Sequence, residues 1–436
     1  MSYEERDQAS YYQARADEEI WQKARRFGVS RRRFLELAGL VGGSALLGAA
    51  CTDDKKKDEA TPQTPSSLPK VDTNIVKDLP PSKFDYTEAV GFNAEMKWEN
   101  MATRGYLTPN DLFFIRQSSP TPRVNQKEWR LTVSGPGVTT PLELNYDQLL
   151  ALPEVTSAIR YVECAGNGRV FFDEVLNQLT YQDGGNGNKV SIPQWRLGAV
   201  GVAEWTGVPL GAILERAGVK PSAKDVVPGG LDESKLRRPM SIAKAMEDDT
   251  LIAFAMNGSP LPLDHGFPVR AIVPGWVGNQ SVKWLGSIEV AEEPVFVPQN
   301  TSIYVYLGPG YQPEPPRMGP VVEKQVMKTA LELEWPAKLA PKAQTIRGRA
   351  WGPEGISKVE YSLDEGKSWK PAQILPGPNE QRAWVRYSFD WEPTAGEYKI
   401  MARATDRKNQ VMPDKVPWNQ HGMNYAAVVA HPVTVA

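Results

Sequence analysis

The stretch Arg160-Tyr-Val-Glu-Cys164-Ala-Gly-Asn167-Gly168-Arg169 places a cysteine between an apolar run and a glycine-containing turn. The segment from Ala158 to Val162 is typical of a short strand, so we expect Cys164 to follow a strand end directly. Free cysteines are often no more than small buried apolar side chains. A cysteine that enters a loop of glycine and asparagine also suits a nucleophile or a metal ligand.

The two chemical roles of Cys164 make different demands on the chain. A cysteine nucleophile needs a nearby base, usually histidine, and the candidates His265 and His421 do not lie in a protease-like local signature. A thiolate that holds a soft, high-valent metal needs only deprotonation and nearby positive charge. Arg169, five residues further on, can supply that charge. The residues alone leave both roles open.

Composition narrows the class of protein. The chain has 436 residues, enough for two or three domains, and its 13 tryptophans are typical of a folded protein. Its 50 basic and 52 acidic residues leave a net charge of −2, which gives no support for nucleic-acid binding. Three histidines make a histidine-built metal site difficult to assemble, and two cysteines exclude a disulfide framework and a CxxCH haem site.

The N-terminus predicts export. Ser30-Arg-Arg-Arg-Phe-Leu35 resembles a twin-arginine signal, and the apolar run from Leu37 to Ala50 is too short for a comfortable membrane span. The alternative is an ordinary amphipathic helix with a basic start. Leu46-Leu-Gly-Ala-Ala-Cys51 resembles a lipoprotein cleavage site, so Cys51 is a possible lipid anchor. We expect a signal over 1–51, a polar tether over 52–83, and a location in the periplasm or on the outer face of the cytoplasmic membrane.

Two folded domains follow the tether. Residues 84–316 interleave predicted strands with short helices, which favours an α+β or mixed catalytic domain. The predicted strands are 129–135 and 158–162, the predicted helices are 146–152 and 209–217, and the segments 242–246 and 251–256 continue the mixed pattern. Residues 317–436 show only alternating apolar positions separated by turns, as in Ala383, Val385, Tyr387, Phe389 and Trp391. That alternation predicts an all-β sandwich of immunoglobulin type.

Several separate segments resemble the sulfite oxidase family in order and spacing, from about residue 85 to the C-terminus. The cysteine segment is similar to that family's active-site loop. The other similar segments are 111–120, Trp205-Thr-Gly-Val-Pro-Leu210 with Leu214 and Gly218, Gly230-Leu-Asp232, Asn257 to Arg270 and Pro274 to Leu285. The resemblance implies a sulfite-oxidase-type molybdopterin-binding domain followed by a sandwich that packs as a dimerisation domain in a homodimer.

The resemblance also implies the site residues. Cys164 is expected as the thiolate ligand of molybdenum. The residues expected to bind the molybdopterin cofactor, with its phosphate and its ring donors and acceptors, are Arg116, Gln117, Ser118, Cys164, Asp232, His265, Arg270, Ser281, Val282 and Lys283. Gly278 is expected to allow close backbone approach, and Ser281 to Lys283 to offer backbone amides. The residues expected at the reacting end are Arg116, Cys164, Arg169, Tyr304 (with Tyr306 as the alternative) and His421.

The resemblance implies oxidation of sulfite to sulfate, with Arg116 and Arg169 holding the oxyanion. Because we expect no haem in this chain, which lacks a CxxCH attachment site, electrons are expected to pass to a separate carrier such as a c-type cytochrome, or to oxygen. Three positions depart from the family pattern: Ser118 replaces histidine, Gly168 replaces an extra arginine of animal enzymes, and His421 replaces arginine. A protonated His421 would hold an anion in a pH-dependent way. The alternatives are reduction of sulfoxides or N-oxides at the same centre, and a cofactor-free lipoprotein adapter.

Overall fold

The computed structural model describes residues 84–86, 93–102, 104–183, 189–190 and 192–436. The predicted export signal, Cys51 and the tether lie outside the described residues. All described residues belong to one compact unit, Pro69–Ala436. Within these residues, no helix combines the length and the apolar content that a membrane crossing requires.

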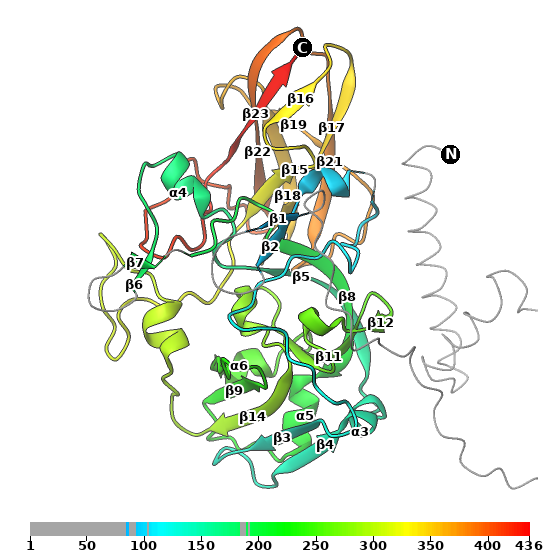
Figure 1. Ribbon diagram of the computed structural model, residues 1–436, viewed down its shortest axis with the longest axis vertical. Coiled ribbons are helices and arrows are strands. Elements are labelled where there is room, and N and C mark those ends of the chain that lie inside the picture. The colour runs from blue at the N-terminus through cyan, green and yellow to red at the C-terminus, as the bar shows by residue number, and fades with distance from the viewer. Residues whose placement is uncertain (1–83, 87–92, 103, 184–188, 191) are drawn as a thin grey trace, which may run out of the picture. The chain divides into compact units, whose positions relative to one another are not determined.

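The first part of the chain is built on one mixed sheet and one antiparallel sheet (Figure 1). One has the strand order β10 (Met240–Ser241), β9 (Asp225–Gly230), β14 (Leu285–Ala291), β3 (Arg130–Ser134) and β4 (Leu142–Asn145), in which only β14 and β3 run parallel. The other has the order β12 (Ser259–Pro260), β11 (Leu251–Met256), β8 (Val200–Pro209) and β5 (Thr156–Glu163), with β13 (Arg270–Ile272) paired to β11.

Short helices and hairpins connect these sheets. The hairpins are β1 (Phe84–Tyr86) with β2 (Ala94–Met96) and β6 (Gln182–Asp183) with β7 (Lys189–Val190). The α-helices are α3 (Tyr146–Leu150), α4 (Val170–Glu174), α5 (Leu210–Arg216) and α6 (Ile242–Ala245). The 3-10 turns are η1 (Trp98–Met101), η2 (Leu263–His265) and η3 (Gly278–Gln280), and η4 (Gln299–Ile303) is a π-helical turn. These elements confirm the predicted mixed class, and the predicted helix at 146–152 ends two residues early.

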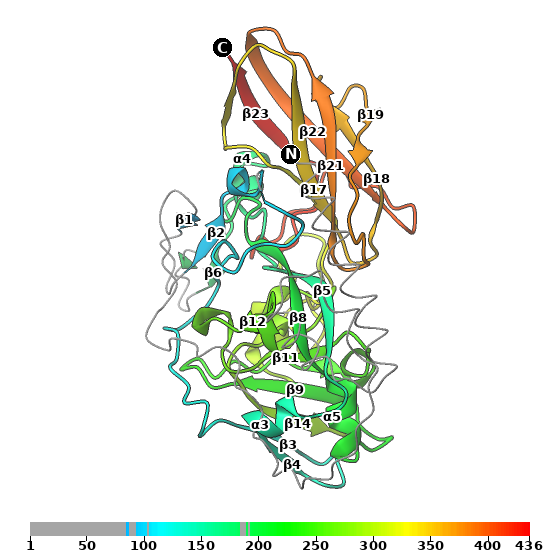
Figure 2. The same cartoon turned by 90° about the vertical axis from the view of Figure 1, so that its right-hand side faces the viewer.

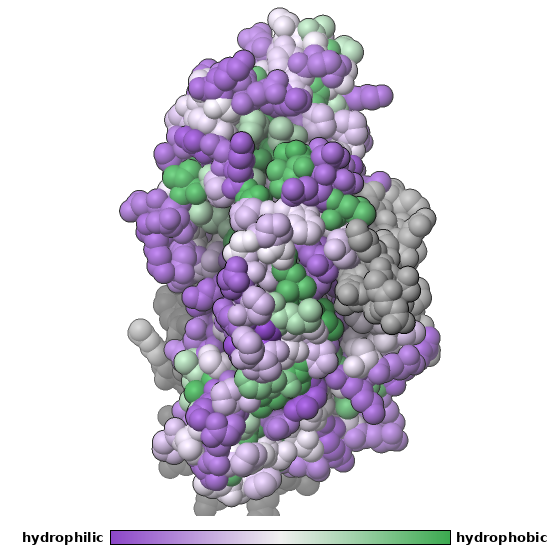
Figure 3. Space-filling model, turned by 90° about the vertical axis from the view of Figure 1, so that its left-hand side faces the viewer, coloured by the Kyte–Doolittle hydropathy of each residue, from purple (hydrophilic) through white to green (hydrophobic). Residues whose placement is uncertain are grey.

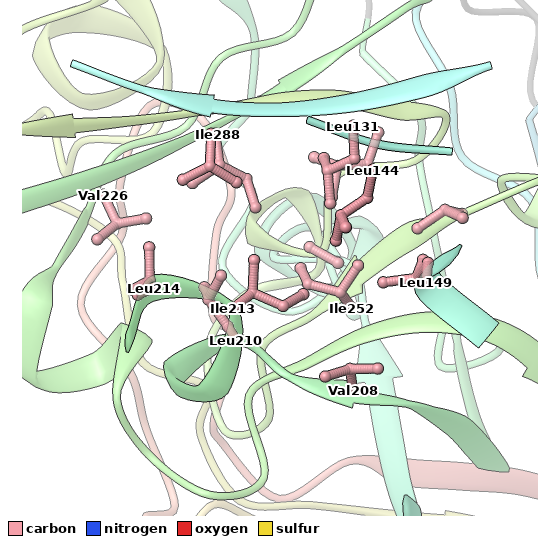
Figure 4. Packing of buried hydrophobic residues seen from close by; sticks show 14 of the residues in the cluster. Leu131, Leu144, Leu149, Val208, Leu210, Ile213, Leu214, Val226, Ile252 and Ile288 are labelled. Carbon is pink, nitrogen blue, oxygen red and sulfur yellow. The ribbon is translucent and has the colours of Figure 1, made fainter. Parts of the chain in front are cut away.

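Local sequence explains where these elements begin and how they pack. Asn145 and Gln148 form a reciprocal capping box at the start of α3, which satisfies backbone donors that the helix leaves free. The apolar positions of α5 face the first sheet, and Figure 4 shows Ile213 and Leu214 pointing toward Ile288 and Val226 of that sheet. This shared core holds the sheets in place beneath the loops that carry the site.

The predicted sandwich is confirmed, and its strands are coloured gold to red in Figure 2. One sheet has the order β15 (Lys328–Leu331), β17 (Gln344–Trp351), β21 (Trp384–Trp391) and β20 (Gln373–Ile374). The other has the order β16 (Ala337–Leu339), β23 (Ala430–Val435), β22 (Gly396–Asp406), β18 (Ile356–Ser362) and β19 (Lys370–Pro371). Buried and half-buried positions alternate in β23, as expected of a strand with one face in a core.

The sandwich shares a buried aromatic cluster with the first part of the chain. The Trp98 ring centroid lies 5.8 Å from that of Trp351 and 5.9 Å from that of Trp384. The Arg349 guanidinium pairs with Glu332 at 2.7 Å and also donates to the carbonyls of Tyr106 and Gly105. The two domains are therefore joined by a packed interface. On the face shown in Figure 3, polar side chains cover most of the surface and apolar ones form small separate groups.

Candidate cofactor and substrate site

The candidate site is a cavity that encloses about 1080 Å³ of empty space, part of it open to solvent. Its walls come from loops that follow strands and turns of both sheets, as is common where a rigid scaffold carries a binding site. Of the cofactor-binding residues predicted from the sequence, the cavity is lined by Arg116, Gln117, Ser118, Cys164, Asp232, His265, Arg270, Ser281 and Lys283. The fold therefore brings together residues that are up to 167 positions apart.

The Arg270 guanidinium marks the most buried cationic part of this cavity. It opens β13 and donates to the backbone carbonyls of His265 at 3.0 Å and Ser281 at 2.9 Å. Among the described residues, no carboxylate forms an ion pair with it. Burial lowers the pKa of Arg270 to about 9. A buried cation held in place by neutral carbonyls retains its attraction for an anion.

Lys283 adds a second cation to the same part of the cavity. Its ammonium donates to Gln117 Oε1 at 3.0 Å and to the Asp264 carbonyl at 2.8 Å, and it lies 4.3 Å from the Trp284 ring centroid. Burial, together with the positive charge of Arg270, lowers the pKa of Lys283 to about 7. Concentrated positive charge in a cavity is what a bound phosphate needs, and the phosphate would in turn stabilise the charged lysine.

Unsatisfied polar atoms line another part of the cavity. Both carboxylate oxygens of Asp264, and both amide atoms of the Asn279 side chain, are buried without a hydrogen-bond partner among the described residues. Asp232 is better satisfied, because Ser119 donates to its Oδ2 at 2.9 Å and Ser234 donates to the same atom. Buried carboxylates and amides without partners are suited to the N–H donors and the ring nitrogens of a heterocycle.

A smaller cavity adjoins the first at Cys164. The residues that line both are Arg116, Cys164, Ile303 and Tyr304, and the smaller cavity adds Arg169, His421 and Met423. The Cys164 thiol is buried and follows directly after β5, as predicted. The structure thus brings all five residues predicted for the reacting end around one space beside the cysteine.

Arg169 is held firmly at this smaller cavity. Its Nε donates to the His421 carbonyl at 2.9 Å, and its Nη1 donates to the Pro193 carbonyl. Burial lowers the pKa of Arg169 to about 10, so the guanidinium remains charged at neutral pH. Arg116 is only half-buried, and its Nη1 donates to Ser118 Oγ at 3.1 Å. The two guanidinium groups provide the positive charge for a small anion.

His421 lines the smaller cavity, but its environment disfavours the protonated form that would hold an anion. Burial and the positive charge of Arg169 lower its pKa, and hydrogen bonds to the backbone at Ile303 and Val305 oppose this only in part. The imidazole is therefore neutral at neutral pH. Its Nδ1 is buried and has no hydrogen-bond partner among the described residues.

The structure distinguishes the two candidate tyrosines. Tyr304 follows η4 and lines both cavities, and burial raises its pKa, so its phenol stays protonated. Tyr306 lines neither cavity. It stacks on Tyr311 and accepts a hydrogen bond from Asn424 at 2.8 Å, so its role is in packing.

Val282 is the predicted cofactor-binding residue that the cavity does not contain. Its apolar side chain lies in the hydrophobic core with Leu285. The backbone amides of Ser281 and Val282 donate to the carbonyls of Gly278 and Gln280, so they are not directed at an anion as expected. Gly278 does allow close approach, but to the chain itself: a Cβ there would lie 2.6 Å from the Glu163 carbonyl oxygen.

Three residues with a clear place in the site were missed by the sequence analysis. Asp264 lies in the segment from Asn257 to Arg270 and Asn279 in the segment from Pro274 to Leu285, so their position in these motifs is the available signal. Arg238 had no such signal. It is buried behind the site, donates to Gln280 at 3.0 Å and lies 5.4 Å from the Tyr304 ring centroid.

The arrangement defines a class of protein. One buried thiol faces both a cationic, heterocycle-sized cavity and a smaller anion pocket, which is the arrangement of a redox enzyme that binds an anionic metal cofactor. A molybdenum–molybdopterin cofactor fits these residues: Arg270 and Lys283 would hold its phosphate, Asp264 and Asn279 would meet the pterin, and Cys164 would bind the metal.

The comparisons with known proteins agree with that class. Residues 118–298 match the family model "Oxidoreductase molybdopterin binding domain", and residues 325–435 match "Mo-co oxidoreductase dimerisation domain". Sulfite oxidase of Gallus gallus is 33% identical over 355 residues, which cover 76% of this chain and 74% of that protein. The chain belongs to the sulfite oxidase family of molybdopterin-dependent oxidoreductases.

Two further relatives define the extent of the similarity. Mitochondrial sulfite oxidase of Mus musculus is 32% identical over 354 residues, covering 76% of this chain but only 62% of that protein. The crystal structure of the sulfane dehydrogenase SoxCD from Paracoccus pantotrophus superposes with a TM-score of 0.69 and 27% identity, over 83% of this chain and 92% of that chain. The similarity therefore includes both domains described above.

Proposed function

We propose that this protein oxidises sulfite to sulfate and passes the two electrons singly to a separate carrier. The observation that carries the proposal is the small pocket beside Cys164, to which Arg116, Arg169 and Tyr304 contribute. Two of the most similar proteins are named as sulfite oxidases, which supports the same substrate. Guanidinium groups match the geometry and charge of a small oxyanion.

The side chains have separate tasks in this proposal. When bound, the molybdenum cofactor supplies two-electron oxygen-atom transfer. Arg116 and Arg169 bind and orient the oxyanion, and the carbonyls of His421 and Pro193 fix the Arg169 guanidinium. Tyr304, whose pKa is raised by burial, acts as a hydrogen-bond donor at the pocket. Because His421 is neutral, the positive charge of the pocket comes from Arg116 and Arg169 alone among these side chains. This charge suits one small anion.

The electron acceptor, the oligomer and the location belong to the same proposal. A c-type cytochrome is the acceptor that we propose, because the chain's two cysteines provide no haem attachment site. Residues 325–435 match a dimerisation domain, which supports a homodimer. The twin-arginine-like segment at 30–35 supports export to the periplasm, and Cys51 is a possible lipid anchor there.

The test is sulfite-dependent reduction of cytochrome c by the cofactor-loaded protein. Arg116→Met removes one pocket cation, and we expect the sulfite KM to rise by roughly 10- to 100-fold, since hydrogen bonds to charged groups contribute about 1.5–3 kcal/mol. Arg216→Met is the control, because this exposed arginine pairs with Glu154 on the surface. Sulfite turnover with an unchanged KM in Arg116→Met would contradict the proposed binding role.

The opposite direction is tested on the same sample. Reduced enzyme is offered a sulfoxide and an N-oxide, and consumption of either is measured alongside sulfite turnover. Reduction of one of these compounds without sulfite oxidation would replace the proposed function with a reductase.

A further inference from the structure

The loop that carries Cys164 is bonded to the C-terminal sandwich through a fully buried ion pair. Glu163, the residue before the cysteine, accepts from the Lys328 ammonium at 2.6 Å, and the two side chains are 0% and 2% exposed. Lys328 is the first residue of β15, where it pairs in register with Trp351 of β17. The cation therefore comes from a rigid strand of the second domain.

The same carboxylate orders the loop on the other side of the cysteine. Asn167 donates from Nδ2 to Glu163 Oε1 at 2.9 Å, and its own Oδ1 accepts from the Ala199 amide at 3.0 Å. The Asn167 amide donates to the Cys164 carbonyl at 2.9 Å. Glu163 Oε1 therefore accepts both from the sandwich and from the turn that follows Cys164.

The sandwich domain also holds the main chain of this loop. Gln325 donates from Nε2 to the Glu163 carbonyl at 2.5 Å, and the Asn424 amide donates to the Ala165 carbonyl at 2.7 Å. The backbone on both sides of Cys164 is therefore fixed by residues from the C-terminal part of the chain.

We infer that the sandwich is part of the metal site, and that the Glu163–Lys328 pair positions the Cys164 thiolate. A buried ion pair costs desolvation of two charges, so such a pair is weak evidence for a role in stability alone. What the charged pair adds is a directional contact at fixed length, which determines where the loop lies. The inference rests on the assignment of Cys164 as the metal ligand.

The chain contains a matched control for this pair. Arg349 and Glu332 form another ion pair at 2.7 Å with side chains 0% and 3% exposed, and Arg349 also reaches across the domain interface to the Tyr106 carbonyl. Among the described residues, Arg349 forms no hydrogen bond or ion pair with the cysteine loop. Loss of this pair should weaken the interface as much as loss of Lys328, without affecting the position of Cys164.

The first experiment is hydrogen exchange on the cofactor-free protein, followed in the peptide that covers residues 160–170. Lys328→Met leaves a buried carboxylate without its partner, and we expect exchange in this peptide to be on the order of 10- to 100-fold faster. Adding Glu163→Gln to this variant removes the unpaired charge and should restore slow exchange. Arg349→Met should leave this peptide unchanged.

Gln325→Leu gives a milder perturbation if Lys328→Met does not fold. This variant lacks one hydrogen bond to the Glu163 carbonyl, so we expect hydrogen exchange in the same peptide to be roughly several-fold faster. Unchanged exchange in both variants, or equal acceleration in Arg349→Met, would overturn the inference.

The second experiment uses the molybdenum-loaded protein and reads the electron paramagnetic resonance spectrum of the one-electron-reduced centre. Lys328→Met should shift this spectrum, the double variant should return it toward wild type, and Arg349→Met should leave it unshifted. A spectrum unchanged in loaded Lys328→Met would overturn the positioning role. Wild-type protein that takes up no molybdenum would instead refute Cys164 as the ligand, while the exchange data would still test the bonded loop.

Discussion

Replacing Lys283 by methionine should make the cofactor-free protein more stable and the loaded protein weaker in cofactor binding. The pKa of Lys283 is lowered from 10.5 to about 7, first by burial and then by the charge of Arg270. At about 1.4 kcal/mol per pKa unit, folding with this lysine costs about 4 kcal/mol at pH 7. The two hydrogen bonds of its ammonium return about 1 kcal/mol each. We therefore expect the free energy of unfolding of cofactor-free Lys283→Met to exceed that of the wild type by about 2 kcal/mol at pH 7.

The pH dependence identifies the cause. Between pH 7 and 10.5 the unfolded chain holds a proton on Lys283 that the folded chain has lost, so the wild-type free energy of unfolding rises with pH through this window and levels off below it. Lys283→Met lacks this contribution. Its advantage over wild type should therefore shrink by about 2 kcal/mol from pH 7 to pH 9.

The assay is urea unfolding of both cofactor-free proteins at pH 7 and 9, followed by tryptophan fluorescence. Lys224→Met is the control, because this lysine is exposed and its partner Glu293 is 81% exposed. In the loaded protein we expect pterin to be retained roughly 10-fold less well, since one charge-assisted bond to the phosphate is lost. A Lys283→Met variant less stable than wild type by the same amount at both pH values would refute the reasoning.

Three further changes test the rest of the site and the domain interface. His421→Arg should lower the sulfite KM by roughly tenfold, because it adds a permanent cation where the wild-type imidazole is neutral. Steady-state kinetics at pH 7 and 8 measure this change. An unchanged KM would contradict a neutral His421. Gly166→Ala should reduce kcat/KM for sulfite by roughly tenfold, because a Cβ there would displace the Arg169 guanidinium. The melting temperature of the variant is recorded as a control for stability. Full activity would contradict the prediction, because it would show that Arg169 has room to move. Arg382→Ala should lower the free energy of unfolding by about 0.5–1 kcal/mol, because its partly buried pairs with Glu247 and Asp249 are lost. A loss that persists undiminished at high salt would contradict an electrostatic cause.

Much of this fold follows from local pattern. The alternation of apolar and polar positions over residues 317–436 predicts the sandwich, because one face of each strand is buried there. The helix at 146 could be placed because Asn145 and Gln148 cap it. Val282 shows the limit of motif matching: it stands between two cavity residues, but its apolar side chain turns into the core.

The contacts that hold the site could not be predicted in the same way. Lys328 and Glu163 are 165 positions apart, and neither residue type suggests burial. The same holds for Arg238, which reaches the Val322 carbonyl at 2.8 Å from a different loop. The neutral state of His421 also depends on burial and on Arg169, which only the folded chain brings beside it. Charged residues in the interior are specified by the whole fold, not by neighbouring sequence.

The central claim is that Cys164 holds molybdenum in a bound molybdopterin cofactor. The most direct test is metal and pterin analysis of the protein purified from a host that makes molybdopterin, beside a Cys164→Ser variant. We predict about one molybdenum per chain in the wild type, and in the variant a loss of metal or of sulfite-dependent cytochrome c reduction. Wild-type protein with neither molybdenum nor pterin, or a Cys164→Ser variant that retains both the metal and full turnover, would contradict the account.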